Sequence, residues 1–278
     1  MRSTVLQDLS DASLVDAIEA NLYEFLGMQR QWPRAEVHTN PELAWAITGV
    51  SLSIFNSLWN TRLTAEAAEA AIQAAIARGQ TRGVPLLWWT GPASRPADIG
   101  ARLERYGFHR SEMEHGMAVD LRAFKDSQSD PAGLTIEPVQ DLETLNTWCH
   151  TFVAGFGFPV NVESVFLDWF SGASLGLAHL PLRHYLGRLN GEAAATSSVF
   201  YASGVAGIYN VATLSDARRR GIGAAMTLAP LRAARAAGYR SISEIQVSDM
   251  GAPVYRKLGF QKYCDIGIYE WVGDPASV

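Results

Sequence analysis

Alternating apolar and polar residues predict a set of short strands in the second half of the chain. Two of them are joined by Asn190-Gly191, a dipeptide that supplies the positive φ angles of a type I′ hairpin turn. Ser203-Gly204 marks a further turn, so three consecutive strands should be antiparallel neighbours. The predicted strands cover residues 134–139, 184–189, 193–201, 205–213 and 242–247.

Helical periodicity places helices between these strands. In residues 142–152 the side chains of Leu145, Trp148, Cys149 and Phe152 fall on one face. Further helices are predicted at residues 162–170, at 224–237 and around Tyr255. The resulting order is strand, two helices, three antiparallel strands, helix, strand, helix and final strands. It predicts an α/β (α+β) fold in which helices flank a mixed, mostly antiparallel sheet.

The first half repeats part of this order and ends its second helix in Gly107-Phe108. The polar segment 126–133 contains Pro and Gly and is the predicted linker. We therefore expect a domain at 1–125 and another at 134–278. The elements predicted in the first half are a hairpin at 42–48 and 53–58, helices at 64–78 and 97–106, and strands at 86–89 and 113–119.

Composition narrows the function classes. Hydrophobic residues make up 48% of the chain and the net charge is −5, which predicts a packed core and argues against nucleic-acid binding. No apolar run reaches the roughly 20 residues needed to cross a bilayer, and the first residues lack a secretory signal pattern. Two distant cysteines suit a reducing compartment, and six scattered histidines predict no metal site. We expect a soluble, cytoplasmic protein.

The segment Arg218-Arg-Arg-Gly-Ile-Gly223 lies between a predicted strand and a predicted helix. Free amide groups at a helix start, glycines that allow close approach, and three arginines together favour a phosphate group. A Walker loop would need Lys and Ser or Thr after Gly223, where Ala224 and Ala225 stand. A dinucleotide fingerprint would need glycine at Met226, so both of these alternatives fit poorly.

Two blocks resemble the GCN5-related N-acetyltransferases (GNAT). Arg218-x-x-Gly221-x-Gly223 matches the family signature that binds the pyrophosphate of acetyl-CoA, and residues 248–260, with Tyr255 before Leu-Gly-Phe260, resemble the family's terminal block. The resemblance covers about 134–272 and implies the acyl-CoA N-acyltransferase fold. Residues 58–63 lack a glycine pair, so the first half is interpreted as a degenerate GNAT-like copy without a CoA loop; the alternative is an unrelated α/β domain.

The resemblance also implies the site residues. Acetyl-CoA, as co-substrate, would pair its pantetheine arm with Val211–Thr213, whose backbone N–H would also polarise the thioester. Arg218 would serve loop structure, and Tyr255 would protonate the departing thiolate. The implied cofactor-binding residues are Val211, Ala212, Thr213, Arg218, Arg219, Arg220, Gly221, Ile222, Gly223, Ala224 and Ser248.

The general base stays open. Relatives often carry a carboxylate where Asn210 stands, and a carboxamide cannot take a proton. The candidates are Glu163, Asp168, His150, Glu244 or a chain of waters.

The sequence therefore predicts an acetyl-CoA-dependent N-acetyltransferase. Neither Cys149 nor Cys264 lies in a nucleophile motif, which favours direct transfer to a primary amine, on a small molecule or a peptide. The acidic balance favours a cationic acceptor. No membrane or nucleic-acid partner is expected, and a homodimer is left open. The alternative function is a non-catalytic acyl-CoA-binding or sensing protein.

Overall fold

The computed structural model divides the chain into two compact units, neither of which is continuous in sequence. The carboxyl unit contains Met1–Asn21 and Met117–Tyr263, and the amino unit contains Leu22–Gly116 and Cys264–Val278. Whether each is a copy of one fold, as the predicted boundary at 126–133 supposes, stays a prediction. The structure describes residues 4–111, 114–126, 129–175, 181–247 and 251–273, with only the backbone for 242–247.

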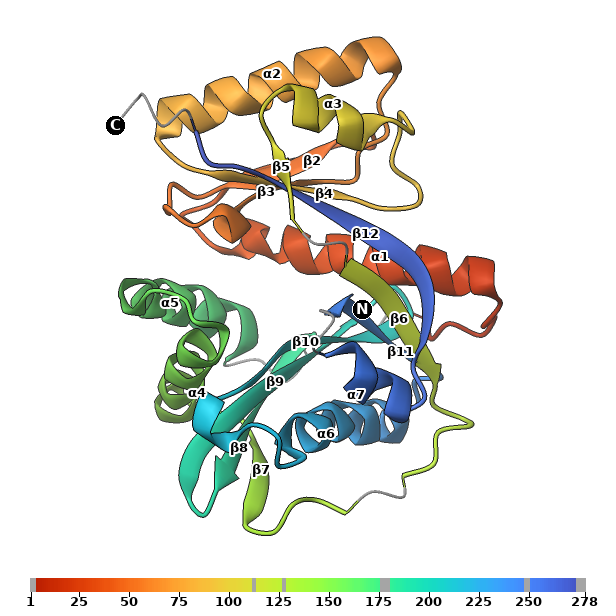
Figure 1. Ribbon diagram of the computed structural model, residues 1–278, viewed down its shortest axis with the longest axis vertical. Helices are drawn as coiled ribbons and strands as arrows, with labels where there is room; N and C mark the ends of the chain where they lie inside the picture. Colours follow the sequence, from red (N-terminus) through yellow and green to blue (C-terminus); the bar gives the residue numbers. More distant parts are fainter. Residues whose placement is uncertain (1–3, 112–113, 127–128, 176–180, 248–250, 274–278) are drawn as a thin grey trace. The chain divides into compact units, whose positions relative to one another are not determined.

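The described residues form helices and strands in alternation (Figure 1). The α-helices are α1 (Asp11–Gly27), α2 (Ala65–Arg82), α3 (Ile99–Arg105), α4 (Leu142–Phe156), α5 (Glu163–Ser174), α6 (Ile222–Ala236) and α7 (Ala252–Lys257). The 3₁₀ turns are η1 (Met28–Gln31), η2 (Ser53–Phe55), η3 (Val160–Val162) and η4 (Ser215–Ala217). The strands are β1 (Glu36–Thr39), β2 (Ala44–Ile47), β3 (Asn56–Trp59), β4 (Leu86–Thr90), β5 (His109–Arg110), β6 (Glu114–Asp120), β7 (Leu134–Pro138), β8 (Leu182–Leu189), β9 (Glu192–Ala202), β10 (Val205–Thr213), β11 (Ser241–Val247) and β12 (Gln261–Trp271).

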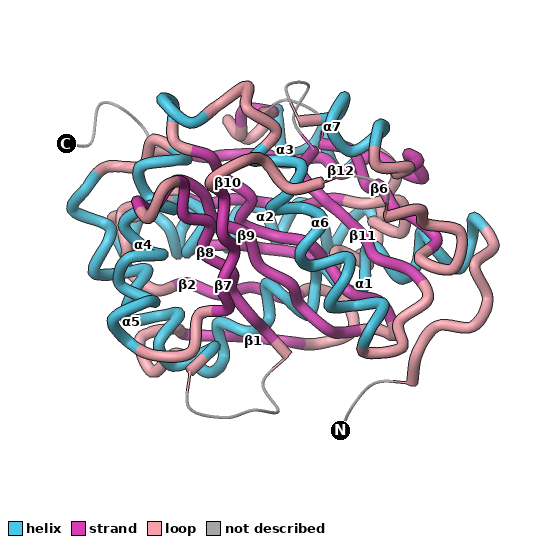
Figure 2. Tube along the Cα trace, turned by 90° about the horizontal axis from the view of Figure 1, so that it is seen from below, coloured by secondary structure: helices cyan, strands magenta, loops and turns pink. Residues whose placement is uncertain are grey.

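The sheet of the carboxyl unit is mixed, as predicted. Strands β7, β8, β9 and β10 are antiparallel neighbours that run side by side in Figure 2. Strand β11 then pairs with β10 in parallel. Helices α4 and α5 pack on one face of this sheet, and α6 and α7 lie on the other (Figure 1).

Local sequence explains several boundaries in this unit. The Asp141 carboxylate accepts a 2.8 Å hydrogen bond from the Thr144 N–H and so caps α4, while Gly157 at φ 74° ends it. Asn190 and Gly191 take φ values of 52° and 92°, which confirms the predicted hairpin turn.

Each face of the carboxyl-unit sheet has its own core. On the α4–α5 side the aromatic rings of Trp148, Phe152 and Phe170 stack or meet edge to face. The α6–α7 side packs aliphatic side chains such as Leu228 and Leu231 around Tyr255. Burial of this kind contributes about 1.5–3 kcal/mol for each large apolar side chain.

Leu6 and Asn21, near the amino terminus, are hydrogen-bonded to strands and turns of the carboxyl unit. The Leu6 N–H donates to the Gly204 carbonyl over 2.9 Å, and the Asn21 amide nitrogen donates to the carbonyls of Phe200 and Ala202. A Cβ on Gly207 would lie 2.1 Å from the Asn21 Oδ1, so this contact requires glycine there.

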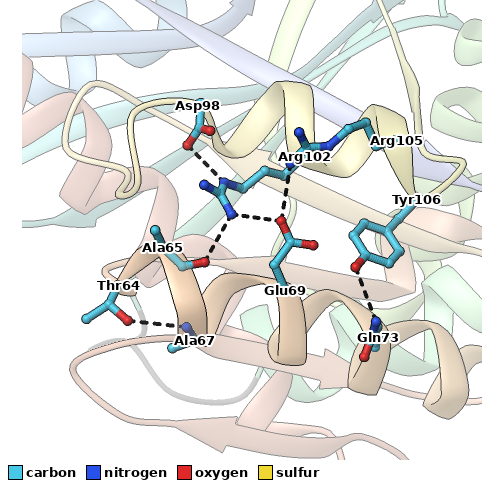
Figure 3. Close-up of polar contacts among 9 residues, drawn as sticks. All are labelled: Thr64, Ala65, Ala67, Glu69, Gln73, Asp98, Arg102, Arg105 and Tyr106. Atoms are coloured by element: carbon cyan, nitrogen blue, oxygen red, sulfur yellow. Dashed lines mark hydrogen bonds and ion pairs between the residues drawn. The ribbon is translucent and has the colours of Figure 1, made fainter.

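The amino unit has a sheet of similar order. Strands β1, β2 and β3 are antiparallel, β4 pairs with β3 in parallel, and the end of β12 pairs with β4. Its core contains Trp88, Phe108 and Leu103, which are at most 1% exposed. Arg102 on α3 donates to Glu69 and to the Ala65 carbonyl on α2 and so holds these helices together (Figure 3).

Two predictions for the first half need correction. Helix α1 was not predicted, because buried Glu19 and Asn21 interrupt its apolar face. The predicted strand at 53–58 begins only at Asn56, because Ser53–Phe55 form the turn η2. The hairpin pairing of β2 with β3 is confirmed.

Asp126 and Asp130, in the predicted linker, form ion pairs with a helix of the carboxyl unit. Arg232 on α6 donates to Asp126 over 2.8 Å and to Asp130 over 3.3 Å. These bonds hold the pKa of Asp126 below its usual value. Along the described part of the chain, every helix is too short or too polar to cross a lipid bilayer.

Candidate active site

Strand β10 separates from β11 halfway along its length. Its residues Ala206–Ile208 pair with Ile242–Glu244, and Asn210 then takes a left-handed φ of 57° inside a register shift. Ala212 and Thr213 pair with β9 on one side. Among the described residues no strand pairs with Asn210–Thr213 on the other side. The backbone there has an open edge that an extended ligand can join as an added strand.

The turn after β10 carries the predicted phosphate loop. The Arg218 Nε donates to the Thr213 carbonyl over 2.9 Å and its terminal nitrogen donates to the Gly155 carbonyl over 3.2 Å. This side chain therefore links the end of β10 to the end of α4. A Cβ on Gly155 would lie 2.8 Å from the Ala212 Cβ, so α4 rests directly on the open part of β10.

Helix α6 begins without a side-chain cap. Gly221, its N-cap residue, has a φ of 80°, and the first intrahelical bond runs from the Ala225 N–H to the Gly221 carbonyl over 3.1 Å. Within the described ranges the N–H groups of Ile222, Gly223 and Ala224 have no hydrogen-bond acceptor. No acidic residue stands in the first turn. Such a helix start favours an anion through its free donors and its dipole.

Two arginines precede this helix start. Arg219 and Arg220 are exposed to solvent, and Arg219 takes a φ of 60°, which is strained for a side chain of its size. The structure thus brings Val211–Thr213 and 218–224 to one end of β10. Of the predicted cofactor residues, Ser248 lies outside the described residues.

Tyr255, on α7, lies in the core on the α6–α7 side of the sheet. It is 6% exposed and its ring meets Phe260 edge to face, with the centroids 5.3 Å apart. It belongs to the same apolar cluster as Ile208, and Val211 packs against that cluster. Pro253 occupies the first turn of α7, where a helix tolerates proline.

The structure does not single out a general base among the predicted candidates. His150 Nδ1 lies 3.0 Å from Glu163 Oε2, and the His150 side chain is 70% exposed, which is typical of a surface ion pair. Asp168 lies on α5. The side chain of Glu244 lies outside the described residues.

Sequence reasoning missed two polar residues here: Ser198, which contacts Asn210, and His184, which contacts Ser198. The Asn210 Nδ2 donates to the Ser198 Oγ over 3.0 Å, and the Ser198 Oγ lies 2.6 Å from His184 Nδ1. His184 is fully buried, and this burial lowers its pKa to about 3. The imidazole is therefore neutral at physiological pH. The only signal in the sequence was the placement of polar residues in apolar strands.

Both cysteines are buried free thiols. Burial, and secondly the charge of Glu163, raise the pKa of Cys149 to about 12, so this thiol stays protonated and unreactive. In the described part of the chain, no three His, Cys, Asp or Glu residues gather as a metal site.

Comparisons with known proteins agree with this geometry. Residues 140–260 match the model of the acetyltransferase (GNAT) family. Among curated proteins, no sequence match was found. A GCN5-related N-acetyltransferase structure from Kribbella flavida is similar in fold, with a TM-score of 0.69 and 18% identity over 93% of this chain and 96% of that one.

Two further structures are similar over nearly the whole chain. One is a GCN5-related N-acetyltransferase from Sphaerobacter thermophilus, with a TM-score of 0.63 and 16% identity over 94% of this chain and 93% of that one. The other is a tandem GNAT protein from the clavulanic acid biosynthesis pathway, with a TM-score of 0.61 and 15% identity over 99% and 98% of the two chains. The chain has the mixed α/β fold of these proteins, and its segment 140–260 matches the acetyltransferase (GNAT) family model.

Proposed function

We propose that the protein transfers an acetyl group from acetyl-CoA directly to a primary amine. The observation that carries this proposal is the open edge of β10 directly before the uncapped start of α6. The open edge of β10 offers backbone hydrogen-bond partners to an extended amide chain, and the start of α6 offers N–H donors to a phosphate. Few ligands other than an acyl-CoA present both groups in this order.

The pyrophosphate would bind at the N–H groups of residues 219–224. Arg219 and Arg220 would add charge there, and each charge-assisted hydrogen bond contributes about 1.5–3 kcal/mol. The pantetheine arm would pair with Val211–Thr213, and Ser248 is proposed to contact it. The glycine at 221 supplies the φ of 80° on which the loop geometry depends.

In the proposed reaction the amine lone pair attacks the thioester carbonyl carbon. A backbone N–H of Val211–Thr213 stabilises the charge that develops on the carbonyl oxygen. The C–S bond then breaks, and Tyr255 donates its phenolic proton to the departing sulfur. The proton lost by the amine passes to water, since Asn210 cannot accept it.

Direct transfer, without an acetylated enzyme, is supported by the cysteines. Cys149 is fully buried and its thiol stays protonated because its pKa is raised to about 12. A thiol in that state is a poor nucleophile. Free thiols also support the proposed cytoplasmic location.

The acceptor is proposed to be a cationic small molecule or an exposed peptide amine. The net charge of −5 supports this, since a negative field attracts cations. Thiol release from acetyl-CoA tests the proposal across a panel of spermidine, phenylethylamine, glucosamine and a peptide with a free amino terminus. We expect release well above the amine-free background for at least one of them.

A second candidate function is an acyl-CoA-binding protein without turnover. Asn210 favours it, because a carboxamide stands where relatives often carry a carboxylate. Both functions predict acetyl-CoA binding. Tight binding without thiol release for any amine would favour this second function.

A further inference from the structure

A row of three polar side chains, each in contact with the next, crosses three neighbouring strands of the carboxyl unit. His184 on β8, Ser198 on β9 and Asn210 on β10 are joined by contacts of 2.6 Å and 3.0 Å. His184 and Ser198 are at most 1% exposed. Asn210, at the other end of this row, is half-buried and is the first residue of the open edge of β10. Buried polar groups are costly unless they are paired, so this arrangement needs an explanation.

The surroundings of the imidazole fix its tautomer. The ring centroids of Trp148 and Phe170 lie 4.2 Å and 4.8 Å from that of His184, and His184 Nε2 is buried without a hydrogen-bond partner in the described structure. Aromatic faces are electron-rich and tolerate an N–H better than a lone pair. This favours the neutral ring with its proton on Nε2 and an acceptor at Nδ1, which is also the tautomer that lets the Ser198 Oγ accept from the Asn210 Nδ2.

The tautomer in turn fixes the orientation of Asn210. An unprotonated Nδ1 accepts the Ser198 hydroxyl hydrogen, so the Ser198 Oγ is left to accept from the Asn210 Nδ2. The carbonyl oxygen of the Asn210 side chain then points away from Ser198. In the part of the chain that the structure describes, this oxygen has no hydrogen-bond donor.

We propose that the Asn210 Oδ1 accepts a hydrogen bond from the acceptor amine, while Ser198 and His184 act as positioning residues. This inference rests on the proposed acetyl transfer and names the group that holds its nucleophile. A carboxamide oxygen orients an N–H without taking its proton, so it directs the amine lone pair toward the thioester beside Val211–Thr213. Asn210 is then a binding residue rather than a base.

Two variants and their combination test the proposed roles of Ser198 and Asn210. Asn210→Gly keeps the left-handed backbone but removes the carboxamide, and Ser198→Ala removes its anchor. Using the panel amine that the wild type acetylates fastest, we expect each to lower kcat/KM for the amine by about tenfold, the loss of one oriented hydrogen bond. The Kd of acetyl-CoA should not change.

The double variant separates positioning from a general structural role. If Ser198 acts only through Asn210, Ser198→Ala should have no further effect in the Asn210→Gly background. Ser197→Ala is the matched control, because the neighbouring Ser197 hydroxyl is buried without a partner and should be dispensable. Losses that multiply in the double variant, or unchanged turnover in Asn210→Gly, would overturn the inference.

A second measurement does not depend on turnover. ¹⁵N NMR of the histidine side chains should show His184 as the neutral Nε2–H tautomer between about pH 5 and 8. The Nδ1–H tautomer would overturn the proposed orientation of Asn210. A wild type that acetylates no amine would instead contradict the proposed function, whatever the tautomer.

Discussion

The two units differ in how one helix begins: α2 in the amino unit has a side-chain cap, and α6 in the carboxyl unit has none. In both, a strand that pairs in parallel with the next strand leads into a helix: β10 into α6, and β3 into α2. At α2 the Thr64 hydroxyl accepts from the Ala67 N–H over 3.2 Å. Hydrogen bonds from its own backbone N–H and from Thr64 hold the pKa of Glu66 below its usual value. At α6 the N-cap is Gly221, which has no side chain to offer.

The strands that lead into these helices also differ in whether their backbone edge is open or paired. Past Ile208 the edge of β10 is open among the described residues. In the amino unit the Arg95 N–H donates to the Thr61 carbonyl over 2.9 Å, and the Leu63 N–H donates to the Arg95 carbonyl over 3.1 Å. In the amino unit, the backbone at Arg95 therefore pairs with the segment that follows β3, whereas the corresponding end of β10 in the carboxyl unit has an open edge.

The difference shows what would let this arrangement bind a ligand, which we propose to be acetyl-CoA. A helix start and a diverging strand edge leave unpaired donors and acceptors, and these are either satisfied by the protein or offered to a ligand. Thr64, Glu66 and Arg95 satisfy them in the amino unit. This supports our proposal that the amino unit is a GNAT-like copy that no longer binds the cofactor.

The largest expected effect comes from Gly221→Val. Valine is strongly disfavoured at a φ of 80°, so the loop should rearrange, and its side chain would stand where the phosphate approaches. We expect acetyl-CoA affinity, measured by calorimetry, to fall at least about a hundredfold, equivalent to roughly 3 kcal/mol. Gly238→Val is the matched control: it has a φ of 87° at the other end of α6 and should cost stability but keep binding.

Tyr255→Phe should act on turnover rather than binding. Loss of the proton donor should lower kcat by about a hundredfold or more, while acetyl-CoA affinity stays nearly constant. The amino unit carries Leu103 at the same distance before its Gly-Phe pair, which fits our proposal that this unit does not bind the cofactor. Tyr106→Phe removes the hydrogen bonds of the Tyr106 hydroxyl with Gln73 and Glu69, and it should leave kcat unchanged. Equal kcat for Tyr255→Phe and wild type would remove Tyr255 from the mechanism.

Arg220→Ala should weaken acetyl-CoA binding by about 1–3 kcal/mol, if the guanidinium makes one charge-assisted hydrogen bond. The loss should shrink at high salt because this arginine is exposed. Arg62→Ala, in the corresponding segment before α2, is the control and should leave affinity unaltered. An equal loss in both variants would mean that general charge, rather than the loop, governs binding.

The smallest effects concern the closed helix start. Thr64→Ala should destabilise the protein by about 1 kcal/mol in denaturant unfolding, through loss of the N-cap, without changing acetyl-CoA affinity. Glu66→Gln should also destabilise at pH 7. Because the folded pKa of Glu66 is lowered, its contribution is present above the unfolded pKa and is lost as the pH falls through the folded value. The difference between Glu66→Gln and wild type should therefore vanish in acid.

Local chemistry made much of the carboxyl unit predictable. The turn at Asn190-Gly191 and the strand Val205–Thr213 were found because their side chains and glycines determine backbone conformation over a few residues. The start of α6 was located for the same reason, since Gly221 has a positive φ there, while its role in binding a phosphate stays a prediction.

Long-range pairing was not predictable in this way. Asn21 interrupts the apolar face of α1, and its partners at Phe200 and Ala202 lie about 180 residues away. A two-residue turn at 190–191 would place His184 opposite Ser197, but a register shift between Gly187 and Arg188 places it opposite Ser198. No local sequence pattern predicts that shift, so the contacts that join His184, Ser198 and Asn210 could not be found from the sequence.

The most direct test of the account is the number of acetyl-CoA molecules bound by one chain. Isothermal titration of the wild-type protein should give one molecule per chain, and the same titration of Gly221→Val should give none. That pair of results would assign the only acetyl-CoA site to the uncapped start of α6. Two molecules per chain, or one that remains in Gly221→Val, would contradict the claim that the amino unit has filled its site with its own side chains and backbone.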